Sequence, residues 1–161
     1  MHQLAAYAAA AWAFAFAAVS FYWALGGTVG LDTLAVELER DAREGGAELL
    51  TLAVAPGVGK LALGLLALAL AVPRLSPLPR RAVIVLAWLA GIGLSLYGAV
   101  LTVEKALMKS GVIDVPESLG DDRVGWYLYF WDSLWLLGGI LFLLAAVGVR
   151  REAERERDAR E

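Results

Sequence analysis

Residues 126–139 read WYLYFWDSLWLLGG, and this stretch opens the last long apolar segment of the chain. It contains one carboxylate, Asp132, which lies between Trp131 and Trp135. A carboxylate within a segment that crosses a bilayer costs at least about 2.5–3.5 kcal/mol on insertion scales, so such a residue is a candidate for function. We therefore expect the other apolar segments to be arranged around this one.

The composition is typical of an integral membrane protein. Of the 161 residues 60% are hydrophobic, and the mean hydropathy is +0.64. Four apolar runs have about the ~20 residues that a membrane-spanning helix needs. They cover residues 4–25, 49–72, 82–104 and 126–149. The sequence predicts an all-α fold, an integral membrane four-helix bundle that forms a single transmembrane domain over residues 1–149, followed by a charged tail at residues 150–161.

Charged residues are segregated between the two ends of the predicted helices. The first connection has six acidic residues and two arginines, whereas the second carries Arg74, Arg80 and Arg81 and no acid. The tail beyond Val149 has five arginines. Because Lys and Arg near the ends of transmembrane helices favour the cytoplasm, we expect both termini and the arginine-rich turn to be cytoplasmic and the acidic connections to lie outside.

Several kinds of chemistry have no residues to support them. The chain has no cysteine, which excludes disulfides and thiolate metal sites, and its single histidine is His2. The sequence contains no helical histidine pair and no carboxylate cluster at metal-ligand spacing, so it indicates no metal site and no cofactor. The first run lacks a basic leader and is longer than the apolar part of a signal peptide, so we expect a retained helix.

The connection between the first two runs predicts a short amphipathic helix at about residues 32–44, begun by Asp32. Leu31, Leu34 and Leu38 would lie on the membrane surface or cover the mouth of the bundle. In the alternative interpretation the helix is solvated and has no specific role.

Two further features concern the second and third runs. Pro56 predicts a kink in the second run, four residues before Lys60. Lys60 is expected to extend toward an interface, to pair with a carboxylate or to sit in a polar cavity. In the third run small residues recur at four-residue spacing, which predicts close packing against another helix. These residues are Ala87, Gly91 and Ser95, with Gly98 nearby.

Polar and aromatic side chains of all four runs fall in the outer half of the predicted bundle. A rise of about 1.5 Å per residue puts Asp132 about 9 Å and Lys60 about 16 Å below the outer ends of their helices, close enough to pair if the helices are adjacent. The predicted ligand-binding residues are Asp132, Lys60, Trp131, Trp135, Tyr22, Trp23, Tyr97, Glu104 and Tyr129. Alternatively, the aromatic residues form an interface belt and Asp132 ties helices together.

Aromatic walls with a carboxylate suit an organic cation or an amphipathic molecule. The sequence therefore favours a membrane protein that binds or transports a small lipophilic or cationic molecule in an outer-leaflet pocket. One alternative is a membrane enzyme acting on a lipid or isoprenoid, with Asp132 or Glu104 as general acid or base. Another is a structural partner of a second membrane protein. The expected partners are membrane lipids, such a ligand, and a second copy or another membrane protein; nucleic acid is not among them.

Two short motifs resemble those of a known family. FYWALGGTVGLD at residues 21–32 and YFWD at residues 129–132 resemble an uncharacterised bacterial family of small four-pass membrane proteins, domain of unknown function 3995. The matched positions are Tyr22, Trp23, Ala24, Gly26, Gly27, Trp131 and Asp132. Some relatives carry a histidine before the Tyr-Trp pair, where this chain has Phe21. The resemblance implies four helices in a bacterial cytoplasmic (inner) membrane and no established activity.

Overall fold

The computed structural model describes residues 2–44 and 53–159, and these residues form helices and connecting turns without a strand. The α-helices of more than three residues are α1 (His2–Ala24), α2 (Val36–Glu44), α4 (Ala55–Ala71), α5 (Arg80–Lys109) and α7 (Asp132–Asp158). Shorter turns are η1 (Leu31–Thr33), η3 (Pro73–Leu75), η4 (Asp121–Arg123), α6 (Val124–Trp126) and the π-helical turn η5 (Tyr127–Trp131). The predicted all-helical class is confirmed. The start of the second apolar run, residues 49–52, lies outside the described residues.

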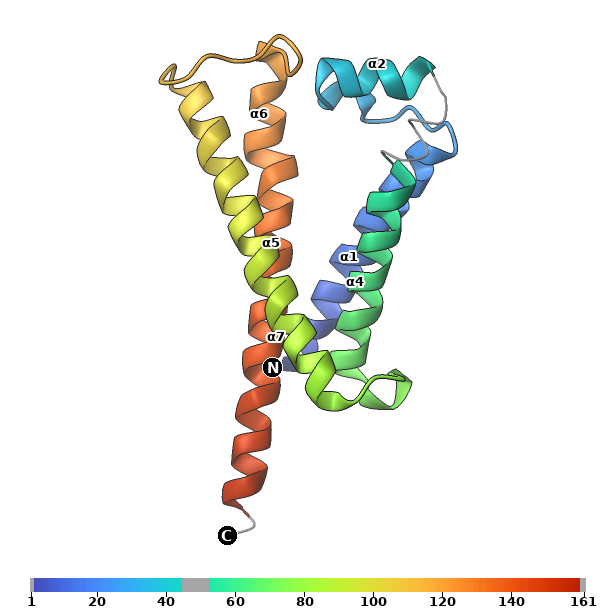
Figure 1. Ribbon diagram of the computed structural model, residues 1–161, viewed down its shortest axis with the longest axis vertical. Helices are drawn as coiled ribbons and strands as arrows, with labels where there is room; N and C mark the ends of the chain where they lie inside the picture. The colour runs from blue at the N-terminus through green and yellow to red at the C-terminus, as the bar shows by residue number, and fades with distance from the viewer. Residues whose placement is uncertain (1, 45–52, 160–161) are drawn as a thin grey trace.

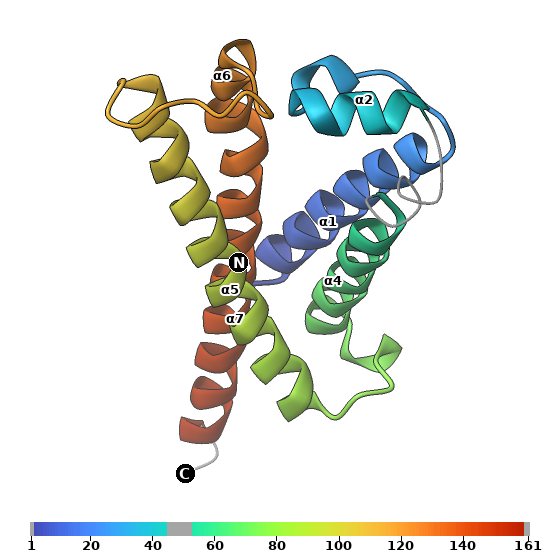
Figure 2. The ribbon, with the colours of Figure 1, turned by 45° about the horizontal axis from the view of Figure 1, so that its top comes forward.

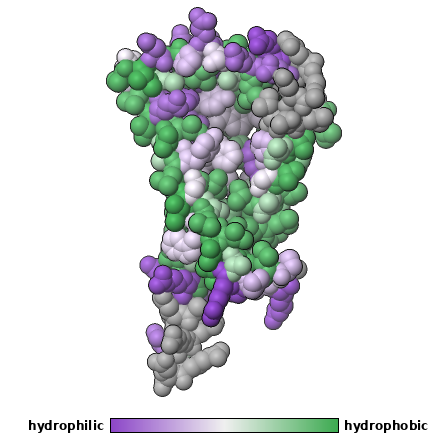
Figure 3. Space-filling view, in the orientation of Figure 1, coloured by the Kyte–Doolittle hydropathy of each residue, from purple (hydrophilic) through white to green (hydrophobic). Residues whose placement is uncertain are grey.

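Three helical stretches of the described chain are long and apolar enough to cross a membrane, namely Gln3–Ala24, Arg80–Lys109 and Asp121–Glu152. The described part of α4 is also apolar, and its 17 residues span about 25 Å. Figure 3 shows an apolar band across the middle of the molecule, with hydrophilic residues at both ends. Length, composition and surface all indicate a membrane protein.

The long helices form two antiparallel pairs, α1 with α4 and α5 with α7, and α1 also packs against α7 (Figure 1). Both views show the pairs diverging toward one end of the molecule, where α2 lies (Figures 1 and 2). The two termini and the turn between α4 and α5 lie toward the opposite end. The arginine-rich turn and the termini therefore share one end, as the charge pattern predicts.

Small residues bring α5 and α7 into close contact. A Cβ atom at Gly98 would collide with the backbone nitrogen of Leu136, and one at Gly139 would collide with the backbone of Ser95. A Cβ atom at Gly91 would likewise lie within 3.0 Å of the side chain and backbone nitrogen of Leu143 in α7. The predicted small-residue face of the third run is thus the α5–α7 interface, where close backbone approach gives the van der Waals contact that holds helices together in lipid.

The alanine-rich α1 packs between α4 and α7. A Cβ atom at Gly64 of α4 would collide with the ring of Phe14, and one at Gly138 of α7 would collide with Trp12. Both contacts lie toward the end where the two helix pairs converge. Phe142 is fully buried in the same part of the fold, in a cluster that consists largely of alanines. The close packing at this end leaves the wider end of the fold for a cavity.

One local prediction is wrong. The outer helix begins at Val36 rather than Asp32, because Leu34 is extended (φ −85°, ψ 168°) and divides the segment into η1 and α2. Pro56 lies in the first turn of α4, which directly follows the π-helical residues 53 and 54. The segment before them lies outside the described residues, so the kink at Pro56 stays a prediction.

Candidate functional site

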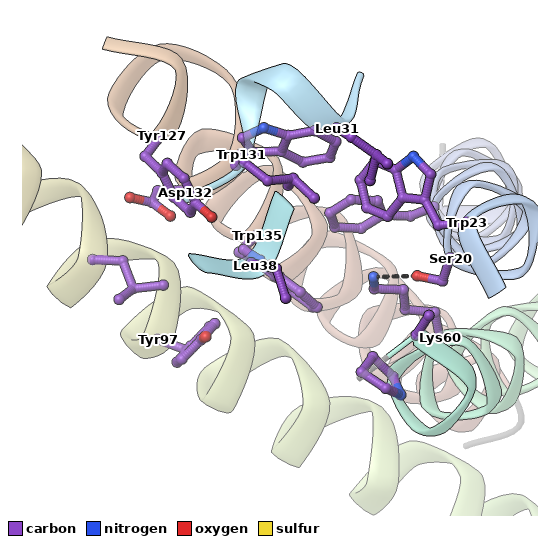
Figure 4. A pocket seen from close by; sticks show the side chains of 15 residues that line it. Ser20, Trp23, Leu31, Leu38, Lys60, Tyr97, Tyr127, Trp131, Asp132 and Trp135 are labelled. Carbon is purple, nitrogen blue, oxygen red and sulfur yellow. Dashed lines mark hydrogen bonds between the residues drawn. The ribbon is translucent and has the colours of Figure 1, made fainter. Parts of the chain in front are cut away.

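A cavity of about 230 Å³ lies where the helix pairs diverge, and α1, α4, α5, α7 and the segment around α2 all contribute to its walls (Figure 4). Six of the predicted ligand-binding residues line it: Asp132, Lys60, Trp131, Trp135, Trp23 and Tyr97. The prediction did not include other lining residues, among them Phe16, Ser20, Leu101 and Tyr127.

Asp132 is buried, with 2% of its surface exposed, and its Oδ2 atom has no hydrogen-bond partner. It makes no hydrogen bond or ion pair to any described residue, although buried polar groups in proteins are nearly always bonded. Among the described residues no hydrogen bond or ion pair from Asp132 ties two helices together, although the charge of Lys105 on α5 acts on its carboxylate. Asp132 lines the cavity, and its Oδ2 atom keeps an acceptor position that no described residue fills.

The part of α5 that faces Asp132 adds a second polar atom. The antiparallel register that sets Gly98 against Leu136 continues one turn further and brings Thr102 level with Asp132. Thr102 Oγ1 is also buried without a hydrogen-bond partner in the described structure. Thr102 itself does not line the cavity. The next turn of α5 carries Lys105, which is ion-paired with Glu104 and near enough for its charge to act on the Asp132 carboxylate.

The π-helical turn η5 explains how the aromatic residues and Asp132 reach the same cavity. Tyr127 and Trp131 belong to this wider turn, and Asp132 follows it directly. The hydroxyl of Ser133 donates to the carbonyl of Leu128, five residues earlier, at 2.8 Å. A wider turn rotates the residues after it relative to those before it, and such insertions are frequent at functional sites. Tyr127, Trp131 and Asp132 therefore all line the cavity.

Lys60 occupies the opposite side of the cavity from Asp132 (Figure 4). Its ammonium donates a hydrogen bond to Ser20 Oγ at 2.8 Å and lies 4.0 Å from the ring centroid of Phe16 and 5.2 Å from that of Trp135. Only 7% of its surface is exposed. Within the described chain no ion pair joins Lys60 to Asp132, so the expected pairing is not found. Ser20 and the rings take the place of the carboxylate.

Aromatic rings form the wall between these two charges. Trp131 stacks on Phe16 with ring centroids 6.0 Å apart and an angle of 11° between the planes. Trp135 meets Tyr97 edge to face at 5.6 Å, and Trp131 also packs against Trp23 at 5.5 Å. Such ring pairs add to the stability that burial provides and fix the shape of the wall.

Residues 31–44, which we call the lid, cover the wide end of the cavity. Leu31, Leu34 and Leu38 turn inward and line it. The backbone N–H of Ala35 donates to the hydroxyl of Tyr127 at 3.1 Å. Of the two roles that the sequence left open for these leucines, covering the mouth of the helices is the one that the structure has.

Arg123, the last residue of η4, joins the lid to the segment that leads into α7. Arg123 donates to the carbonyl of Leu34 at 2.6 Å and forms an ion pair with Glu39 at 2.7 Å. Hydrogen bonds from Arg43 and then from Arg123 lower the pKa of the Glu39 carboxyl below its ordinary value of 4.5. The indole of Trp131 donates to Thr33 Oγ1 at 3.2 Å. The lid thus follows α1 in the chain, but its hydrogen bonds and its ion pair are made to η4 and η5, which lead into α7 of the other helix pair.

Three of the predicted site residues lie away from the cavity. The hydroxyl of Tyr22 accepts hydrogen bonds from the backbone N–H groups of Thr28 and Val29, both at 3.2 Å, and so supports the loop after α1. Tyr129 is 73% exposed. Glu104 forms an ion pair with Lys105 at 2.6 Å. Among the described residues no group of three or more His, Asp or Glu side chains is arranged to hold a metal ion.

A family model described as a protein of unknown function, DUF3995, matches residues 13–142. The chain belongs to the DUF3995 family. This confirms the resemblance seen in the two short motifs, and the DUF3995 match includes every residue that lines the cavity. No curated protein and no solved structure matches the chain.

Proposed function

We propose that this DUF3995 protein is a four-pass protein of the bacterial cytoplasmic membrane that binds a small amphipathic organic cation in the cavity beneath the lid. Its termini and arginine-rich turn would face the cytoplasm, and the lid would face outside. Lipids of the outer leaflet would then surround the cavity. The charge distribution supports this orientation, because the arginines of the turn and tail lie at the end opposite the acidic lid.

The observation that carries the proposal is the unpartnered Oδ2 of Asp132 at the wall of an aromatic cavity. A buried carboxylate without a partner is costly, and a ligand cation would supply both the opposite charge and, where it bears N–H groups, a hydrogen-bond donor. Trp131 and Trp135 line the same cavity, and indole rings attract a cation that lies over their faces. Carboxylate and rings together favour an amine or quaternary ammonium over a neutral or anionic ligand.

The size and lining of the cavity restrict the ligand. Its volume of about 230 Å³ lies below the range of about 300–1,000 Å³ of typical small-molecule sites. Leu31, Leu34 and Leu38 add an apolar roof. A compact cationic group with an apolar attachment fits these walls better than an extended polar molecule.

Binding of octyltrimethylammonium and octylammonium to the purified protein in maltoside micelles tests the proposal, with neutral octyl glucoside as the matched amphiphile. We expect both cations to raise the unfolding temperature and the glucoside to have no effect at the same concentration. Asp132→Asn keeps the shape of the side chain and removes the charge, so it should weaken cation binding about tenfold or more. Asp121→Asn changes an exposed carboxylate of η4 and should leave cation binding unchanged.

Two results would overturn the proposal. In the first, neither cation binds the native protein more tightly than the glucoside does. In the second, Asp132→Asn binds the cations as well as the native protein does, which would show that the carboxylate does not recognise the ligand. Circular dichroism of the variant in the same micelles establishes that it is folded.

A further inference from the structure

Lys60 is a buried ammonium group with little of its bonding capacity used. An ammonium has three N–H donors, and within the described structure only Ser20 Oγ accepts from it. Phe16 and Trp135 contact it through their ring faces, which stabilise a cation but accept no conventional hydrogen bond. The cavity thus has a second charged group with free bonding positions, opposite in sign to Asp132.

The two charges are separated across the cavity rather than paired. Figure 4 shows Lys60 beside Ser20 at one side and Asp132 at the other, with the ring of Trp135 between them. Both side chains are more than nine-tenths buried, and both line the same cavity. A buried charge is stabilised by an opposite charge with good geometry. Neither residue forms an ion pair in the described structure, although the buried ammonium of Lys105 lies near enough for its charge to act on the Asp132 carboxylate.

We infer that the ligand is a zwitterion, in which an ammonium group is joined through a short linker to a phosphate or carboxylate group. The ammonium lies at Asp132 and the anionic group at Lys60 and Ser20. A zwitterion satisfies both buried charges at once, whereas a simple cation satisfies one and is repelled by the other. This inference rests on the proposed function and adds to it the second half of the ligand.

An apolar surface is available for a chain attached to the anionic group. A groove of about 730 Å³ lies between α4 and α5, and Gly59, the residue before Lys60, lines it together with Leu63 and Leu89. The same head chemistry therefore has two sources, a phospholipid of the membrane and a free zwitterion such as phosphoethanolamine. The two sources differ in whether an acyl chain contributes to binding.

A matched pair of probes separates the two halves of the ligand. Octylphosphocholine carries a trimethylammonium group and a phosphate, and octyltrimethylammonium carries the same ammonium alone. Lys60→Met keeps the apolar stem and removes the charge. We expect it to weaken octylphosphocholine binding about ten- to a hundredfold, the range for a hydrogen bond to a charged group. Binding of octyltrimethylammonium should stay the same or tighten, because a repelling charge is removed.

Control variants keep the test independent of folding. Lys60→Arg keeps the charge and should recover part of the octylphosphocholine affinity. Lys109→Met removes an exposed lysine at the end of α5 and should change neither affinity. A Lys60→Met protein that weakens both probes equally, or neither, overturns the zwitterion and leaves cation binding at Asp132 standing. Failure of both probes to bind the native protein overturns the proposed function itself.

The source of the zwitterion follows from two further measurements. Native mass spectrometry after reconstitution into nanodiscs compares retention of phosphatidylethanolamine with that of phosphatidylglycerol, which carries no ammonium. A preference for phosphatidylethanolamine that is lost in Asp132→Asn, together with weaker retention of both lipids in Lys60→Met, supports a lipid headgroup as the ligand. Displacement of octylphosphocholine by soluble phosphoethanolamine supports a free zwitterion. Absence of both effects overturns the inference.

Discussion

Each buried charge is kept from water by a different kind of neighbour. Lys60 lies against two ring faces and one hydroxyl, so its cation has favourable contacts even without a ligand. Asp132 forms no hydrogen bond or ion pair among the described residues, so only the charge of the nearby Lys105 offsets its own. A carboxylate is also repelled by the negative face of a ring. The site is therefore asymmetric, and occupancy should matter more to Asp132 than to Lys60.

At the same scale, single glycines set how closely α5 and α7 approach. Gly98→Ala should lower the stability of the protein by about 1–3 kcal/mol, because the new methyl group meets the backbone of Leu136 rather than a movable side chain. Gly93 lies in the same helix with nothing within 4 Å of its Cβ position. Gly93→Ala should leave stability unchanged or raise it by up to about 1 kcal/mol. Titration of the micelle-bound protein with dodecyl sulfate measures the free energy of unfolding of both variants. Equal values for Gly98→Ala and Gly93→Ala would contradict a tight α5–α7 interface.

At the scale of the element, the attachment of the lid depends on Arg123. Arg123→Gln removes the ion pair with Glu39 and the charged donor to Leu34, so amide hydrogen exchange in residues 36–44 should become several-fold faster. Arg43→Gln is the matched control, because Arg43 bonds the same carboxylate from within α2 and does not connect the lid to the rest of the protein. Similar exchange rates in both variants would show that the contact across to Arg123 does not hold the lid.

The same contact predicts how the lid responds to acid. The pKa of Glu39 is lower in the folded protein than its ordinary value of 4.5, so its contribution to lid stability is complete above that value and is lost as the pH falls through the lowered pKa. A spin label at Glu37→Cys, in a chain with no other cysteine, should keep the same mobility from about pH 8 to about pH 5 and become more mobile in stronger acid. Glu39→Gln should be mobile at neutral pH and insensitive to acid. A label whose mobility rises already between about pH 7 and about pH 5 would point to a different group.

The elements also show how far the sequence could predict this site. Depth along each helix follows from residue spacing, and it predicted that a set of side chains shares the outer half of the fold. The members of this set that line one cavity are Trp23, Lys60, Tyr97, Trp131, Asp132 and Trp135. Rotation about the helix axis does not follow from spacing when a π-helical turn intervenes. No residue pattern indicates the π-helical turn η5, so the prediction missed the contribution of Tyr127 to the cavity.

The pairing of Lys60 with Asp132 failed for a related reason. Similar depth does not bring two side chains together when their helices belong to pairs that diverge. Ser20 lies on the adjacent helix of the same pair as Lys60 and accepts its hydrogen bond instead. Tyr22 and Glu104 were expected at the site because of their depth, but local partners hold them, the backbone of the following loop for Tyr22 and Lys105 for Glu104. Short-range contacts of this kind depend on loop conformation, which helical periodicity does not determine.

At the scale of the whole molecule, the charge pattern predicts which end faces the cytoplasm, and cysteine labelling tests this orientation. Single cysteines at Ser118, in the loop before η4, and at Ser76, after η3, can be introduced into the cysteine-free chain. In intact cells a membrane-impermeant maleimide should react with the cysteine at position 118, and with that at position 76 only after permeabilisation. The reverse pattern would place the lid and the cavity at the cytoplasmic surface.

The divergence of the two helix pairs toward one end has a mechanical consequence. In the proposed orientation, the protein would occupy more area in the leaflet at the lid end than in the other leaflet, and its shape would be closer to a cone than to a cylinder. Movement of one pair against the other would change the area in that leaflet and leave the area in the opposite leaflet nearly constant. Lipid packing in a single leaflet, and hence membrane curvature, would then act directly on the width of the cavity.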